Sequence, residues 1–116
     1  MSAHLTVRTR TDAEGPVVEL AGELDFAGAP RVLAVLSGLS LSADEMLVLD
    51  LRALTFCDSR GITVLIAAHH RAEEAGATLT LVAVPADIGR TLRLLGVDQL
   101  FGTADTVAAA HAPRGR

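Results

Sequence analysis

The chain is poor in aromatic residues and in cysteine. Its 116 residues include three Phe, one Cys and neither Tyr nor Trp. The shortage of aromatic rings removes the stacking platforms expected of a protein that binds single-stranded nucleic acid. The formal net charge is −4, and no stretch of the sequence clusters basic residues as a phosphate-backbone binder requires. We therefore expect no direct nucleic-acid partner, and one cysteine cannot form an internal disulfide.

Long apolar runs are also missing. None approaches the ~20 residues that a membrane-spanning helix needs, and residues 1–10 lack the apolar core of a signal peptide. We therefore expect a cytoplasmic protein with no membrane partner. Half of the residues are hydrophobic, and a chain of this length is typical of one domain with one proper core.

What is present is an alternation of strand and helix patterns after an initial hairpin. These patterns predict an α/β fold around one mixed sheet. The predicted strands are residues 5–10, 16–22, 46–51, 78–84 and, as a brief last strand, 99–101. The predicted helices begin near Pro30, Ile62, Ala86 and Thr103, and residues 113–116 are expected to form a frayed tail. Helical spacing predicts that the first three helices bury Val32, Leu33, Val35, Leu36 and Leu39, then Ile62, Leu65, Ile66, His69 and Ala72, then Ile88, Leu92 and Leu95.

The segment CDSRG, residues 57–61, lies between a buried strand and an amphipathic helix. A serine at a helix start can accept hydrogen bonds from the free N–H groups of the first turn, so Ser59 is a candidate helix cap. The same position can hold a phosphate, because a helix N-terminus carries partial positive charge. Phosphorylation of Ser59 would add about −1.5 to −2 charges beside Asp58, with Arg60 as a partial counter-charge. The cap and the phosphorylation site are compatible interpretations.

A serine nucleophile is the enzymatic alternative for Ser59. It needs a base, an orienting group and oxyanion donors, and the sequence lacks a G-x-S-x-G elbow because Asp58 directly precedes the serine. We expect no catalytic residue and no enzymatic activity.

Three further features of the sequence are candidate sites. His69 and His70 are adjacent, so they are expected to point to different faces of a helix and not to share a metal ion. Cys57 is expected to be a buried, unreactive thiol. Asp25, in the segment GELD, follows a predicted strand end and is expected in the same loop layer as Ser59, where binding sites often collect.

The order of three segments resembles the STAS domain of bacterial anti-sigma factor antagonists. These segments are LAGELD after the hairpin, MLVLDLRALTFCDSRG before the second helix, and LLGVDQLF near the end. The resemblance covers about residues 5–110. It implies a single STAS-like domain, a mixed central sheet with helices packed mainly on one face.

The resemblance also implies a partner-switching function. In this family the unphosphorylated protein binds an anti-sigma factor that is also an ATP-binding serine kinase, and so releases a sigma factor. Phosphorylation ends the binding, and a serine phosphatase resets it, with no cofactor. Carried over by position, Ser59 is the phosphate acceptor, and Asp25, Asp58, Ser59, Arg60 and Gly61 form the partner-binding site.

One residue departs from the family pattern, which is usually Asp-Ser-Ser/Thr/Ala-Gly. This chain has Arg60, a long cation, directly after the acceptor. The alternative function is a scaffold or sensor module that binds a small anion, a nucleotide or a protein without being phosphorylated, with Arg60 and the helix start as the anion site.

Overall fold

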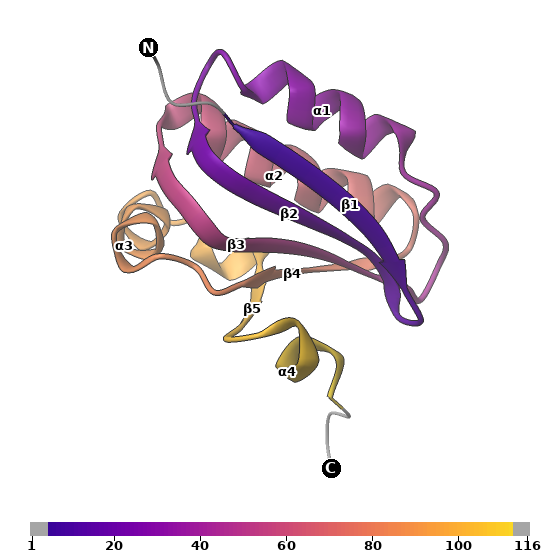
Figure 1. Cartoon of the computed structure of the whole chain (residues 1–116). Helices are drawn as coiled ribbons and strands as arrows, with labels where there is room; N and C mark the ends of the chain where they lie inside the picture. The colour runs from indigo at the N-terminus through magenta and orange to yellow at the C-terminus, as the bar shows by residue number, and fades with distance from the viewer. Residues whose placement is uncertain (1–4, 113–116) are drawn as a thin grey trace.

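Five strands form one sheet whose spatial order is the order of the chain, β1-β2-β3-β4-β5 (Figure 1). The computed structural model describes residues 5–112, so the predicted tail at 113–116 lies outside the described residues. The strands are β1 (Thr6–Asp12), β2 (Gly15–Leu24), β3 (Met46–Cys57), β4 (Thr78–Val82) and β5 (Gly102–Ala104). The helices are α1 (Ala29–Gly38), α2 (Ser59–Glu74), α3 (Ala86–Leu94) and α4 (Val107–His111), with a 3-10 turn η1 at Asp98–Leu100.

The sheet is mixed, as predicted. The β1–β2 hairpin is antiparallel, and the other three neighbouring pairs are parallel. Parallel neighbours need a crossover connection, usually a helix, and here α1, α2 and α3 with η1 supply the three crossovers. Because such crossovers share one hand and the strands follow one another in order, these helices cover the same face of the sheet (Figure 1).

Alternation along the strands divides the core between the two faces. Leu47, Leu49 and Leu51 of β3 point to the face covered by α1, α2 and α3 and belong to the main core cluster. Val48 points to the other face, where it packs with Val17, Val82 and Ala110 of α4 in a smaller cluster. A strand buried on both faces has a continuous apolar sequence, which explains the MLVLDL segment. The helices therefore lie mainly, though not entirely, on one face.

Strand β3 is longer than the predicted segment 46–51. Residues Met46–Asp50 pair with β4, whereas β2 stays paired with β3 as far as Cys57. The pairing of β2 with β3 shifts register twice, between Glu19 and Ala21 and between Gly22 and Glu23, and each time the extra residue is on β3. The continued pairing brings the CDSRG segment to the sheet edge directly beside the end of β2.

Two predictions about the C-terminal third were wrong. Residues 99–101 do not form a strand, because Asp98–Leu100 form the 3-10 turn and the last strand begins at Gly102. A short apolar run cannot be assigned by periodicity alone. The terminal helix begins at Val107 rather than Thr103, because Thr103 pairs with Leu81 in the sheet.

Helix faces were predicted more accurately than helix ends. Ile88 and Leu92 are buried as expected, but Leu95, predicted to lie on the same face, is 58% exposed beyond the last turn of α3. Leu33 of α1 is likewise partly exposed. Within residues 5–112, no helix has both the length and the apolar character of a bilayer span.

Candidate functional site

The parallel strands β2 and β3 end side by side. Leu24 and Cys57, the last residues of the two strands, are register partners. The backbone N–H of Asp58 donates to the carbonyl of Leu24 at 3.3 Å. Asp25 and Ser59 therefore lie in one loop layer, at the sheet edge from which α1 and α2 begin (Figure 1).

Asp58, and not Ser59, caps α2. Asp58 has an extended backbone, and its Oδ1 accepts hydrogen bonds from the N–H groups of Arg60 at 2.9 Å and Gly61 at 3.1 Å. The predicted Ser59 cap is wrong, because Ser59 is already the first residue of the helix. A cap residue must precede the helical turn so that its side chain can reach back to the second and third N–H groups.

Asp25 closes the loop after β2 in a similar way. Its Oδ1 accepts from the N–H groups of Ala27 and Gly28 at 3.1 and 3.0 Å, and its carbonyl accepts from Ala29 at 2.8 Å. The carboxylates of Asp25 and Asp58 thus each hold the main chain of a strand-to-helix turn. Both side chains contribute to the shape of the site by fixing its backbone.

Gly61 lets α2 pack closely against the ends of the two strands. The residue is buried, and a Cβ atom there would lie 2.5 Å from Cys57 Sγ and 2.6 Å from the carbonyl oxygen of Leu24. A side chain would therefore overlap both strand ends. Gly61 sets the position of the helix start and presents no surface of its own.

Ser59 is exposed and its hydroxyl differs from those of the nearby threonines. Thr55 Oγ1 donates to the carbonyl of Gly22, and Thr63 Oγ1 donates to the carbonyl of Ser59, both at 3.0 Å. Among the described residues, the Ser59 hydroxyl has no hydrogen-bond partner. The exposed Arg60 next to it forms no ion pair within residues 5–112.

Cys57 is partly rather than fully buried, and its expected lack of reactivity stays a prediction. Burial raises its pKa to about 12, with the negative charges of Asp58 and Asp87 as further causes. Asp87 belongs to the first turn of α3, and its effect on Cys57 is consistent with α3 starting near this edge of the sheet (Figure 1). A protonated thiol at neutral pH offers neither a nucleophile nor a metal ligand.

Two exposed phenylalanines stand close in sequence to the aspartates of the site, and the sequence analysis missed them. Phe26 follows Asp25 and is 67% exposed, and Phe56 near the end of β3 is 47% exposed. The signal was available, because two of the three phenylalanines of the chain stand within two residues of Asp25 or Asp58. An aromatic side chain in a loop layer has no core to fill, and large exposed apolar groups often mark an interaction surface.

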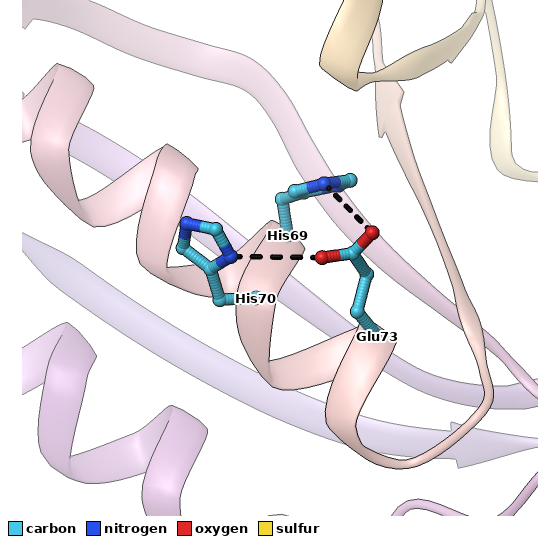
Figure 2. A group of neighbouring side chains, drawn as sticks. All are labelled: His69, His70 and Glu73. Carbon is cyan, nitrogen blue, oxygen red and sulfur yellow. Dashed lines mark ion pairs between the residues drawn. The ribbon is translucent and has the colours of Figure 1, made fainter.

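The two histidines of α2 both lie beside the carboxylate of Glu73. His69 Nε2 lies 3.4 Å from Glu73 Oε2, and His70 Nδ1 lies 3.6 Å from Glu73 Oε1 (Figure 2). One ligand atom from each residue lies within 4.8 Å of the others, the spacing of a group that can hold a metal ion. The expectation that the adjacent histidines do not share a metal ion took no account of Glu73, one turn further along.

Comparisons with known proteins agree with this architecture. A family model described as Mlab, STAS domain matches residues 7–102. The anti-sigma factor antagonist from Mycobacterium paratuberculosis is 27% identical, with a TM-score of 0.75 over 95% of each chain.

Two further solved proteins share the fold at lower identity. SpoIIAA of Bacillus is 16% identical in its unphosphorylated form, with a TM-score of 0.74 over 90% of this chain and 92% of that chain. In its phosphorylated form the values are 19% and 0.68, over 92% and 96% of the two chains. A sulfate transporter family protein from Wolinella succinogenes is 23% identical, with a TM-score of 0.70 over 81% of this chain and 79% of that chain.

Proposed function

Because the chain belongs to the STAS domain family, we propose that it is an anti-sigma factor antagonist switched by phosphorylation of Ser59. The unphosphorylated form binds an anti-sigma factor that is also an ATP-binding serine kinase, and a sigma factor is released. A serine phosphatase restores the binding form. The 27% identity to the mycobacterial antagonist supports the antagonist role, and SpoIIAA, of the same fold, exists in unphosphorylated and phosphorylated forms.

The observation that carries the proposal is the position of the Ser59 hydroxyl. It is exposed at the first residue of α2, whereas the hydroxyls of Thr55 and Thr63 are bonded to main-chain carbonyls. A kinase can therefore reach Ser59 without breaking an internal hydrogen bond.

The capping arrangement determines where the phosphate charge would act. A helix start normally offers free N–H groups to an anion, but here Asp58 already occupies those of Arg60 and Gly61. A phosphate on Ser59 would stay on the surface, beside a carboxylate, and present its −1.5 to −2 charges to the partner. Desolvating that charge in an interface costs several kcal/mol, and each ~1.4 kcal/mol weakens binding tenfold. The switch needs no change of fold.

Phe26 and Phe56 supply the apolar part of the proposed interface. Aromatic side chains dominate the energetics of many interfaces and bury about 150–250 Å² each. Phe26 directly follows Asp25, and Phe56 stands two residues before Asp58, so both exposed rings belong to the chain segments that lead into the site. Gly61 is buried and acts indirectly, because its close packing against the strand ends fixes the position of Ser59.

Phosphate incorporation tests the acceptor. The chain is incubated with a candidate anti-sigma factor kinase and ATP, and its intact mass is measured. One added phosphate is expected on the wild type and on Thr63→Ala, and none on Ser59→Ala. Equal incorporation into wild type and Ser59→Ala would place the acceptor elsewhere, with Thr55 and Thr63 as the first candidates.

Binding to the same partner tests the switch. Ser59→Ala should bind as the wild type does, and Ser59→Glu should bind at least about tenfold more weakly, a loss of ~1.4 kcal/mol. Ser40→Glu is the matched control, because Ser40 is exposed beyond the far end of α1 and receives the same charge. If the phosphorylated chain bound its partner as tightly as the unmodified chain, the proposal would be wrong.

A sensor module that binds a small anion is the second candidate function. It is favoured by Arg60, an exposed cation at a helix start that forms no ion pair within the described part of the chain. This function predicts a rise in melting temperature with phosphate or a nucleotide, without covalent modification, and loss of that rise in Arg60→Ala.

A further inference from the structure

We propose that His69, His70 and Glu73 form a binding site for one divalent transition-metal ion of the zinc class. The site lies in the last turns of α2, at the opposite end of the helix from Ser59. It is independent of the proposed phosphorylation switch.

Helix geometry places Glu73 between the two histidines. Successive residues on an α-helix are rotated by about 100°, so Glu73 lies ~40° from His69 and ~60° from His70 around the axis. Figure 2 shows both rings directed toward the Glu73 carboxylate, which each approaches from its own side. The i,i+4 pair and the i,i+3 pair thereby converge on one carboxylate, with one histidine at each of its oxygens.

The ligand set suits borderline metals. Imidazole binds zinc, copper and nickel, and carboxylates extend the set to harder ions, so two histidines with one carboxylate favour Zn²⁺ or its neighbours over Mg²⁺ or Ca²⁺. With bonds of about 2.0–2.1 Å, neighbouring ligands of a four-coordinate ion lie ~3.3 Å apart. The two nitrogen–oxygen distances here are 3.4 and 3.6 Å, one to each oxygen of the Glu73 carboxylate, and one ligand atom from each residue lies within 4.8 Å of the others. Small side-chain rotations would bring the three atoms to that spacing.

One ligand is held in place before any ion binds. The His69 side chain is 18% exposed, and its ring packs edge-on against Phe101, with ring centroids 6.3 Å apart. His70 and Glu73 are 65% and 62% exposed, so their side chains can rotate to complete the coordination. A fixed first ligand reduces the conformational entropy lost on binding.

The space around the three side chains leaves room for water molecules as further ligands of a bound cation. His69 and Glu73 line a cavity of about 390 Å³ beside β4 and β5, whose lining includes Thr78 and Thr80. Water molecules there can fill the positions that three protein ligands leave free, as in open zinc sites. The C-terminal end of a helix favours positive charge. The nearby Arg71 does not compete, because its guanidinium donates to the carbonyls of Leu36 and Leu39 on α1.

Titration with zinc chloride tests the site on the full chain without an affinity tag. Isothermal calorimetry should give one ion per chain, and the melting temperature should rise with zinc concentration, because an ion that binds only the folded state stabilises it. His69→Ala and Glu73→Gln should each weaken binding at least about tenfold. Glu74→Gln, the same charge change one residue along, and His111→Gln, a histidine on α4, should bind as the wild type does.

Two results would overturn the proposal. One is zinc binding of unchanged affinity in both His69→Ala and Glu73→Gln, which would place the ion at other groups. The other is no heat and no melting shift up to about 1 mM zinc, a concentration that corresponds to only ~4 kcal/mol of binding free energy.

Discussion

Replacing Gly61 by alanine should weaken the fold at the start of α2. The added Cβ would lie 2.5 Å from Cys57 Sγ and 2.6 Å from the Leu24 carbonyl oxygen, where ordinary contacts begin at 3.4 Å. Both atoms, or the start of α2 itself, must move by close to 1 Å, and the Leu24 carbonyl belongs to the main chain of a paired strand. Overpacking of this kind costs about 1–3 kcal/mol, whereas replacing a helical glycine by alanine gains ~0.5–1 kcal/mol. The difference is a net loss of about 0–2.5 kcal/mol, and we expect a value in the upper half of that range because one of the overlaps is with a main-chain atom.

Urea denaturation measures this loss. The midpoint for Gly61→Ala should fall with an unchanged slope, because the surface exposed on unfolding is the same. Gly38→Ala is the matched control, since nothing lies within 4 Å of a Cβ at that position of α1. It should be neutral or stabilise the chain by up to about 1 kcal/mol.

A double variant separates the two overlaps at Gly61. Cys57→Ala removes the sulfur but leaves the Leu24 carbonyl, so it should recover only part of the stability lost in Gly61→Ala. A Gly61→Ala protein that unfolds within about 0.5 kcal/mol of the wild type, the range of an ordinary surface substitution, would refute the close packing described here.

Three further predictions concern the cap, the thiol and α3. Asp58→Ala should cost about 0.5–2 kcal/mol in urea titrations and Ser59→Ala clearly less, because the carboxylate caps α2; equal costs would contradict that assignment. Iodoacetamide should alkylate Cys57 far more slowly in the folded chain than in urea at about pH 8.5, near the unfolded pKa. The folded pKa of about 12 keeps the thiol protonated until the pH approaches that value, so equal rates would show that the pKa is not raised. Leu92→Ala should cost about 2–5 kcal/mol and Leu94→Ala little, because Leu92 is buried and Leu94 is 79% exposed; matching thermal unfolding curves would disprove this packing.

The hairpin and the alternation of strands and helices were predictable because each has a local periodic signal. Of the alternating residues 5–10, all but Leu5 lie in β1, and Gly76, two residues after α2, adopts the positive φ typical of a glycine at a helix C-terminus. The length of β3 was not predictable, since its second half depends on pairing with β2 through two register shifts. Such long-range pairing leaves no mark in a window of a few residues.

The candidate site was predictable in its residues and not in their roles. Asp25, Asp58 and Ser59 were expected in one loop layer, and strand order alone brings them there. Whether Asp58 or Ser59 caps α2 depends on a one-residue difference in where the helix begins, and helix boundaries are the least certain part of any sequence interpretation. The group of His69, His70 and Glu73 was not predicted, because the two histidines were considered without Glu73.

The turns at Asp25 and Asp58, which follow β2 and β3, affect the conformational entropy that the chain loses when a partner binds. Each turn is held by hydrogen bonds from main-chain N–H groups to one carboxylate, so its backbone has little freedom left to lose. Association always costs conformational entropy for each segment that becomes ordered. A molecule that docks at this edge would order few residues of the chain, and most of its contact free energy would remain as affinity. A small change in charge can then shift the balance between bound and free chain without any refolding step.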